Sequence, residues 1–225
     1  LALVRRLIPA LNDSHSFKFD TNNYVGRELN ALTLGVIGTG AIGTSVCKIA
    51  HAFGMRILAF DYLQRPELTK NYHVEYTEKE NIYKEADIIT LHVPLTKETQ
   101  HLITKRELAL MKHTAIIINT ARGELIESED LYNALLNKNI AGAGLDVTEC
   151  EKISLGYGDI TEKLENSDKE CISKVIITRR LSQLNNVIIT PHVAYNTQDS
   201  INRILSVTFD SIKDCLQGGH ANQVN

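Results

Sequence analysis

The sequence lacks the features that mark a membrane protein or a nucleic-acid-binding protein. No apolar run approaches the roughly 20 residues that a helix needs to cross a bilayer, and no secretory signal peptide is visible. The chain has 24 lysines and arginines against 27 aspartates and glutamates, and the basic residues form no dense run. These absences argue against both nucleic acid and anionic membranes as partners.

Cysteine is scarce, and no C-x-x-C pair occurs. The four cysteines are scattered along the chain: Cys47, Cys150, Cys171 and Cys215. This usage fits a reducing compartment better than a disulfide framework or a zinc site. The histidines also lack metal-ligand spacing such as H-E-x-x-H. We therefore expect a cytoplasmic protein that binds no metal.

A glycine-rich turn lies between a predicted strand and a predicted helix. Residues 34–37 form a short apolar run that suits a buried parallel strand, and residues 38–43 spell G-x-G-x-x-G. Residues 41–53 then have the length and pattern of a helix, with one expected apolar face: Val46, Ile49, Ala50 and Phe53. Strand, glycine turn and helix in this order are the context that the dinucleotide-binding fingerprint requires.

Each glycine of this motif has a physical role. Gly38 permits a tight turn, Gly40 leaves room for a pyrophosphate near the backbone, and Gly43 lets the helix pack closely on the strand. The free N–H groups and the dipole at the helix start then attract phosphate.

The next predicted strand, 56–60, supports the same interpretation. It ends at Asp61, about 20 residues after the glycines, where the fingerprint places an acidic residue. A carboxylate there can accept hydrogen bonds from both ribose hydroxyls and would repel a 2′-phosphate, which favours NAD over NADP. The alternative is that Asp61 is only a polar residue at a strand end.

The remaining chain continues to alternate strands and helices, which predicts an α/β fold with a doubly wound parallel sheet. The further predicted strands are 74–76, 87–91, 115–119, 140–145 and 187–190. The further predicted helices are 1–11, 79–85, 104–111, 128–137 and 197–216. Ligands of such sheets bind beyond the carboxyl ends of the strands.

Three stretches lie outside this pattern of strands and helices. Residues 12–28 read as a polar connector, residues 64–67 as a turn and residues 150–174 as an insertion loop. The first helix is expected to present one apolar face: Leu3, Val4, Leu7, Ile8 and Leu11. The last helix is expected to turn another inward: Ile201, Ile204, Leu205 and Phe209. Because the chain starts within a helix and lacks an initiating methionine, we expect a fragment.

Several polar residues at predicted strand ends are candidates for substrate binding, proton donation or cofactor binding. The fork of Arg122 matches the two oxygens of a carboxylate, although the residue could instead cap a loop. His192 can donate a proton near neutral pH or have a structural role only. A carboxylate partner would favour its protonated ring, and both Glu149 and Glu151 are candidates. Asp146 can bind the nicotinamide side of a cofactor or cap a turn.

Five segments occur in one order along the chain. They are the glycine loop with Asp61, HVPLT at 92–96, NTARG at 119–123, GLDV at 144–147 and TPH at 190–192. Together, over about residues 3–216, they resemble the D-isomer-specific 2-hydroxyacid dehydrogenases. The long insertion before His192 and the ending PHVAY at 191–195 look most similar to the D-lactate branch of that family.

The resemblance implies a Rossmann-type NAD-binding domain and a role for each matching residue. His192 matches the proton donor, Arg122 the substrate-binding arginine, and Glu151 the glutamate that pairs with the histidine. It also implies a set of NAD contacts: Ala41 and Ile42 in the loop, Asp61 at the ribose, Val93 and Pro94 on the adenine side, Thr99, and Thr120, Ala121 and Asp146 at the nicotinamide end.

The resemblance further implies a domain organisation. Residues 1–28 correspond to an interdomain helix and connector, 29–196 to the NAD-binding domain, and 197–225 to a helix that returns toward a substrate domain largely absent from the chain. The implied reaction transfers a hydride between NADH and a small 2-keto acid, pyruvate first, in a homodimer. The alternatives are a 3-phosphoglycerate, glycerate or 2-hydroxyisocaproate dehydrogenase, or a NAD-sensing corepressor-like protein.

Overall fold

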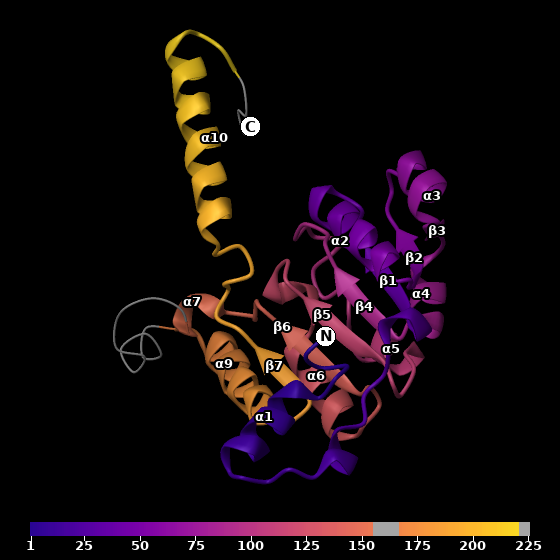
Figure 1. Cartoon of the computed structure of the whole chain (residues 1–225). Coiled ribbons are helices and arrows are strands. Elements are labelled where there is room, and N and C mark those ends of the chain that lie inside the picture. The colour runs from indigo at the N-terminus through magenta and orange to yellow at the C-terminus, as the bar shows by residue number, and fades with distance from the viewer. Residues whose placement is uncertain (155–166, 221–225) are drawn as a thin grey trace. The chain divides into compact units, whose positions relative to one another are not determined.

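The computed structural model describes residues 1–154 and 167–220, and the chain divides into two compact units. The first unit runs from Leu1 to Pro191 and the second from His192 to Asn225. Figure 1 follows the chain from its indigo N-terminus to the yellow helix α10.

A parallel sheet forms the centre of the first unit (Figure 1). In the described ranges it has seven strands: β1 (Thr33–Ile37), β2 (Arg56–Phe60), β3 (Glu75–Tyr76), β4 (Ile88–Leu91), β5 (Ile116–Asn119), β6 (Gly142–Leu145) and β7 (Val187–Ile189). Their spatial order is β3-β2-β1-β4-β5-β6-β7, and every neighbouring pair is parallel. The predicted doubly wound parallel sheet is confirmed, and the chain direction across the sheet reverses between β1 and β4.

Helices flank this sheet in the first unit (Figure 1). They are α1 (Leu7–His15), α2 (Ala41–Ala52), α3 (Pro66–Tyr72), α4 (Lys79–Glu85), α5 (Lys105–Leu110), α6 (Ser128–Leu136), α7 (Glu151–Ser154) and α9 (Lys169–Ser182). Short 3-10 turns span Thr21–Tyr24, Leu29–Ala31 and Gly123–Leu125. The second unit contains α10 (Gln198–Leu216).

The core lies on both faces of the sheet, as expected for parallel strands. One apolar cluster joins β4, β5 and β6 to α4, α5, α6 and α9, and a second joins β1 and β2 to α2 and α3. Helix α4 lies directly on β1, because a Cβ added at Gly35 would come within 2.3 Å of Ile82 Cγ2.

Most predicted element boundaries agree with the structure within two residues. The first helix is an exception, since α1 begins at Leu7 rather than Leu1. Proline is tolerated in the first turn of a helix but disrupts its interior, and Pro9 is the third residue of α1. The predicted apolar face is also largely open, with exposed fractions of 45% at Leu7, 42% at Ile8 and 52% at Leu11.

The predicted apolar face of α2 is only half correct: Ala50 is buried and Val46 packs against the core, but Ile49 and Phe53 do not face it. Gly43, Cys47 and Ala50 are its buried residues, whereas Ile49 is 58% and Phe53 48% exposed. Small side chains let a helix approach a sheet closely, so packing selects them over the larger residues. Hydrophobicity alone therefore predicted Val46 and Ala50 correctly but included two large residues, Ile49 and Phe53, that lie outside the buried stripe.

Three described helices overlap the stretches 64–67 and 150–174, which we expected to be irregular. Helix α3 covers Pro66–Tyr72, where proline at the first helical position has its φ already set for a helix. Helix α9 begins inside the predicted 150–174 loop, and the Asp168 side chain caps it by accepting the Cys171 N–H at 2.7 Å. Helix α7 also falls in this stretch, while residues 155–166 lie outside the described residues.

The inward face predicted for the last helix is not buried. Helix α10 has no buried residue, and Ile204, Leu205 and Phe209 are 53%, 50% and 67% exposed. Within the second unit, no described element covers these side chains. Over the described ranges, no helix combines the length and apolar character needed to cross a membrane.

Two isoleucines test the packing of the helices on the sheet. Ile82 on α4 is fully buried, so Ile82→Ala should lower the free energy of unfolding by about 2–5 kcal/mol. Ile49→Ala on α2 removes the same atoms from an exposed site and should change it by less than about 0.5 kcal/mol. Urea denaturation of both variants measures the difference. Equal losses would contradict the observed orientation of α2.

Candidate functional site

The strand register brings chemistry-bearing residues to one edge of the sheet. The parallel ladders align the last residues of five strands: Ile37, Phe60, Leu91, Asn119 and Leu145. The residues that directly follow them form what we call the carboxyl edge: Gly38, Asp61, His92, Thr120 and Asp146. Ligands of doubly wound sheets bind beyond this edge, next to the point where the strand order reverses.

The glycine turn has the geometry that its sequence predicts. Gly38 has a φ of +97°, and a Cβ there would lie 2.7 Å from the His92 carbonyl. A Cβ on Gly43 would lie 1.9 Å from the Gly38 oxygen, so no side chain fits between α2 and the turn. Around Gly40, by contrast, no atom lies within 4 Å of a Cβ position. The turn is therefore closed on its protein side and open at Gly40.

The open side of the turn is also the start of α2. Gly40 is the N-cap residue, and it offers no side chain to accept the first N–H groups of the helix. Ala41 and Ile42 follow with exposed side chains. Unpaired N–H groups and the positive end of the helix dipole suit an anion such as a pyrophosphate.

Asp61 is bound to the same turn. Its Oδ2 accepts hydrogen bonds from Thr39 N at 2.5 Å and Thr39 Oγ1 at 3.0 Å, and its Oδ1 accepts from Leu63 N at 3.0 Å. Partial burial alone would raise the pKa of Asp61, but these hydrogen bonds outweigh it and hold the pKa below its usual value. The carboxylate is therefore charged at neutral pH.

Thr39 is the part of this arrangement that the sequence analysis missed. Tyr76 Oη donates to Thr39 Oγ1 at 3.0 Å, and Arg65 Nε donates to the Thr39 carbonyl at 2.6 Å. Thr39 is fully buried inside the glycine motif, so it connects the turn to the loop after β2. Its position between two motif glycines was the available signal.

The segment after β4 supplies a polar turn beside Gly38. Burial lowers the pKa of His92 to about 4, so its ring is neutral, and its Nε2 lies 3.0 Å from Thr90 Oγ1. Half-buried Val93 packs on the core and exposed Pro94 follows it. The Thr99 hydroxyl donates to the Pro94 carbonyl at 2.6 Å and accepts from Thr96 N at 2.7 Å. Thr99 thus holds the turn that presents Val93 and Pro94.

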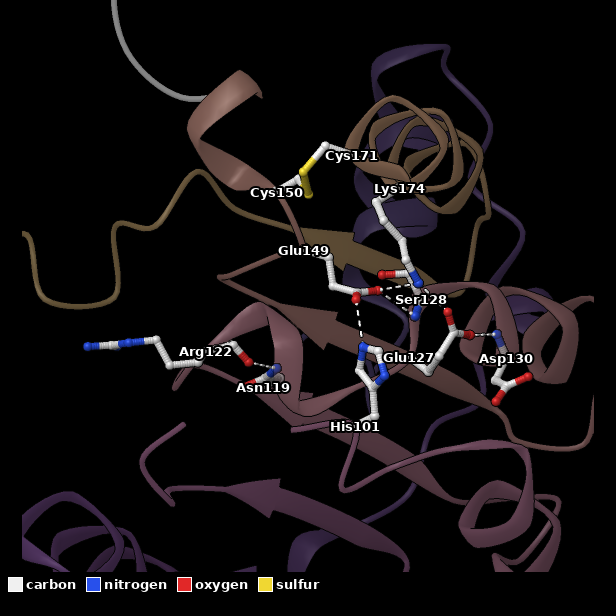
Figure 2. A network of polar contacts seen from close by, with 10 residues as sticks. All are labelled: His101, Asn119, Arg122, Glu127, Ser128, Asp130, Glu149, Cys150, Cys171 and Lys174. Atoms are coloured by element: carbon white, nitrogen blue, oxygen red, sulfur yellow. Dashed lines mark hydrogen bonds and ion pairs between the residues drawn. A yellow bond between two sulfur atoms is a disulfide. The ribbon is translucent and has the colours of Figure 1, made fainter. Parts of the chain in front are cut away.

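Asn119 fixes the loop that carries Arg122 (Figure 2). Its Oδ1 accepts from Ala121 N at 3.0 Å and its Nδ2 donates to the Arg122 carbonyl at 2.8 Å. Thr120 and Ala121 are half-buried, whereas Arg122 is exposed and its Nη1 donates to the Ala121 carbonyl at 2.6 Å. The guanidinium therefore extends from a rigid loop.

The Arg122 loop touches the segment that follows β6. A Cβ on Gly123 would lie 2.1 Å from the Thr148 carbonyl carbon and 2.5 Å from Glu149 N. Only glycine permits this backbone contact. The structure thus brings the Arg122 loop together with residues 148–149, two residues before Glu151.

The two candidate glutamates have different surroundings. Glu149 is buried, and its carboxylate interacts with His101, Ser128 and Lys174 (Figure 2). Glu151 is half-buried at the first position of α7. Glu149 is therefore committed to a structural network, which sequence reasoning missed because its partners are far away in the chain.

Asp146 belongs to the first unit and His192 to the second. Asp146 is buried and accepts a hydrogen bond from Thr190 Oγ1 at 2.5 Å, which ties the end of β7 to the carboxyl edge. His192 is the first residue of the second unit. Its backbone is left-handed, with a φ of 53°, and its ring packs edge-on against Tyr195 at 5.9 Å.

The expectation that cysteines form no disulfide is wrong. Cys150 and Cys171 are bonded, with their Cα atoms 5.5 Å apart (Figure 2). They lie 21 residues apart in sequence, but the first turn of α9 places Cys171 beside the residue that precedes Glu151. Cys47 is free and buried, and burial raises the pKa of its thiol to about 11.

Other candidate sites lie elsewhere or are absent from the described ranges. No group of three histidine, cysteine or acidic side chains there could hold a metal ion. A cavity of about 590 Å³ lies at the opposite, amino end of the strands, where Val4, Asp87 and Ile116 contribute to its lining. The carboxyl edge, rather than this cavity, gathers the residues with chemistry to offer.

Comparisons with known proteins identify a family and several relatives that match most of this chain. Residues 1–194 match the model of a family described as D-isomer specific 2-hydroxyacid dehydrogenase, NAD binding domain. The chain is 38% identical over 225 residues to an aromatic 2-oxoacid reductase of Clostridium sporogenes, covering 99% of this chain and 65% of that protein. It is 40% identical over 192 residues to a D-specific alpha-keto acid dehydrogenase of Enterococcus faecalis, covering 85% and 54%.

Solved structures show the same likeness. The D-lactate dehydrogenase of Aquifex aeolicus, solved with NAD and lactic acid, superimposes with a TM-score of 0.87 at 38% identity. The match covers 96% of this chain and 63% of that one. The chain therefore spans between 54% and 65% of the length of these relatives.

Two glycines separate the roles of the turn. Gly40→Ala should leave the free energy of unfolding nearly unchanged, because its Cβ meets no atom, yet weaken NAD binding about tenfold or more by filling the approach to the backbone. Gly43→Ala should instead lower the free energy of unfolding by at least about 1–3 kcal/mol. Calorimetric NAD titration and urea denaturation measure the two effects. Unweakened NAD binding to Gly40→Ala would refute this role.

The disulfide should contribute to stability. Closing a loop between residues 21 positions apart should raise the free energy of unfolding by roughly 3 kcal/mol in the chain-entropy account. Thermal unfolding with and without a reducing agent measures this. A variant with both Cys150→Ser and Cys171→Ser is the control and should not respond to the reductant. An equal response of both proteins would contradict the disulfide.

Proposed function

The chain belongs to the D-isomer-specific 2-hydroxyacid dehydrogenase family, and from this we propose that the protein transfers a hydride between NADH and a small 2-keto acid. One observation supports this most: the open glycine turn, the charged Asp61 and the exposed Arg122 share one edge of the sheet. That edge combines a dinucleotide cradle with a cation for a carboxylate substrate.

The residues of the carboxyl edge fit NAD. In this proposal the dinucleotide contacts come from Gly38, Gly40, Ala41, Ile42, Gly43, Asp61, Val93, Pro94, Thr99, Thr120, Ala121 and Asp146. The pyrophosphate lies against the backbone at Gly40, where it has room because no protein atom lies within 4 Å of the position that a Cβ would occupy. The charged Asp61 accepts from the ribose hydroxyls and disfavours a 2′-phosphate. Bound at this edge, NADH supplies the hydride.

Three side chains of the protein carry out the rest of the reaction in this proposal. Arg122 binds the substrate carboxylate through two parallel hydrogen bonds and polarises the neighbouring carbonyl. His192 gives its proton to the carbonyl oxygen as that oxygen becomes a hydroxyl. Glu151 favours the protonated imidazole, since a nearby negative charge raises a histidine pKa. Arg122 is well suited to this role because Asn119 holds its loop rigidly.

The preferred substrate in this proposal is pyruvate, with D-lactate as product. The resemblance of residues 191–195 to the D-lactate branch supports this choice, as does the similarity to the Aquifex aeolicus enzyme solved with lactic acid. The likeness to an aromatic 2-oxoacid reductase keeps larger 2-keto acids as the second choice.

We also propose that residues 1–28 and 197–225 adjoin a substrate domain and that the protein is a homodimer. The exposed apolar side chains of α10, such as Ile204 and Phe209, support a packing partner for that helix. Exposed apolar residues near the N-terminus, including Phe17 at 87% and Phe19 at 72%, support a subunit contact.

The test is a panel of 2-keto acids with NADH and the full-length protein. Pyruvate should give the highest kcat/KM, followed by phenylpyruvate, glyoxylate and hydroxypyruvate. His192→Gln should lower kcat by about 10²–10⁴-fold while the Kd for NADH stays the same, because only the proton donor is lost. Arg122→Gln should chiefly raise the KM for the keto acid.

The matched control for these variants is His113→Gln, an exposed histidine that precedes β5 at the amino end of the sheet. It should leave kcat unchanged. Binding of NADH without turnover of any 2-keto acid would instead favour a NAD-sensing protein. An unchanged kcat in the His192→Gln variant would show that His192 is not the proton donor.

A further inference from the structure

An ionic network surrounds the buried Glu149, two residues before Glu151 in the sequence (Figure 2). The side chain of Glu149 is 6% exposed. Its Oε1 lies 2.9 Å from His101 Nε2, and its Oε2 accepts from Ser128 N at 2.9 Å and lies 3.2 Å from Lys174 Nζ. Each oxygen of this carboxylate is thus engaged within the protein. Removing one partner of such a buried charge is costly because water cannot replace it.

Lys174 is the cation that this network shares. It reaches from α9 and forms ion pairs with both Glu127 and Glu149, and its side chain is 13% exposed. Partial burial alone would lower the pKa of Lys174, but its hydrogen bond to Glu127 and the attraction of Glu149 outweigh this and raise the pKa. Lys174 therefore stays charged and balances two carboxylates that would otherwise repel each other.

Glu127 links the same lysine to the N-terminus of α6. Its Oε2 caps α6 by accepting Asp130 N at 2.7 Å, and its Oε1 pairs with Lys174. The N-terminus of α6 also gives the Ser128 N–H to Glu149. Lys174 thus joins α9, the start of α6 and the segment after β6 at one point.

Helix α9 is also bonded to Cys150, the residue that follows Glu149, through a disulfide. Cys171 is three residues before Lys174 on the helix and is bonded to Cys150. Cys150 has a φ of 53°, a left-handed conformation that a residue with a Cβ keeps only where its surroundings enforce it. The two residues that precede Glu151 are thus both attached to α9: Glu149 through Lys174 and Cys150 through the disulfide. These attachments orient the backbone that carries the Glu151 side chain.

We propose that Lys174 is a positioning residue: by holding Glu149, it aims the Glu151 carboxylate at the carboxyl edge. The role of Glu151 in the reaction rests on the function proposed above, whereas the hold on residues 149–151 does not. Without the ammonium, the buried Glu149 and the half-buried Glu127 are left as neighbouring anions. Glu149 then keeps only His101 and the Ser128 N–H as partners, and this weaker hold loosens the segment that leads into Glu151.

The experiment compares Lys174→Met with Lys169→Met in the full-length protein. Lys169 is an exposed lysine on the same helix, so its variant loses the same charge without touching the network. Lys174→Met should speed amide hydrogen exchange of residues 149–153 about tenfold or more, while exchange of the β4 and β5 amides stays unchanged. It should also lower kcat about tenfold while the KM for NADH changes less than about twofold.

Two further variants separate positioning from stability. Lys174→Arg keeps the charge and should restore most of kcat and the slow exchange. In Lys174→Met with Glu127→Gln, one of the two carboxylates becomes a neutral amide that can still cap α6, so folding should recover. The loss of kcat and the fast exchange at 149–153 should nevertheless remain, because Glu149 still lacks its cation.

The outcomes distinguish this proposal from the proposed function. If exchange of residues 149–153 stays as slow in both Lys174→Met proteins as in Lys169→Met, Lys174 does not hold the segment and the proposal fails. Fast exchange with an unchanged kcat would overturn the positioning role. If the wild-type protein reduces no 2-keto acid, the proposed function fails, whereas the exchange rates still decide whether Lys174 holds the segment.

Discussion

The site depends on one steric constraint, the contact between the backbone of α2 and the carbonyl oxygen of Gly38. A Cβ at Gly43 would lie 1.9 Å from that oxygen, so the helix rests on the turn with no side chain between them. This contact directs the first N–H groups of α2 toward the place where the strand order reverses. Asp61 then fixes the turn from the other side through Thr39. The turn at the start of α2 is thus held from both sides by contacts within the protein.

A second backbone contact organises the reactive half of the edge. Gly123 lies directly against Thr148, so the loop that carries Arg122 and the segment that leads into Glu151 cannot move independently. Each loop is also held by polar contacts. Asn119 forms hydrogen bonds with the Arg122 loop, and the ion pair between Glu149 and Lys174 holds the segment that leads into Glu151. Preorganised side chains are effective in catalysis because no rearrangement is needed during the reaction. Under the proposed function, the buried polar groups of this region support the loops that carry Arg122 and Glu151.

The sequence predicted those features that depend on local patterns. Alternating apolar segments indicated the parallel sheet, and the spacing of Gly38, Gly40 and Gly43 indicated a turn whose geometry the structure confirms. Features that depend on packing were missed. The buried stripe of α2 consists of small residues rather than the largest hydrophobic ones, and Cys150 meets Cys171 only because α9 folds back across the segment. Lys174 gave no signal at all, since its partners lie 25 or more residues away in the chain.

The bond between Cys150 and Cys171 gives this part of the chain an unusual covalent topology. Every peptide bond between these two positions belongs to a closed ring, so a protease that cuts once inside the ring produces a nicked protein and not two separate pieces. The strands before and after the ring would remain one molecule, with α9 still attached beside Glu151, until thiols were added. Cuts elsewhere in the backbone have no such protection among the described residues, because Cys47 and Cys215 are unbridged.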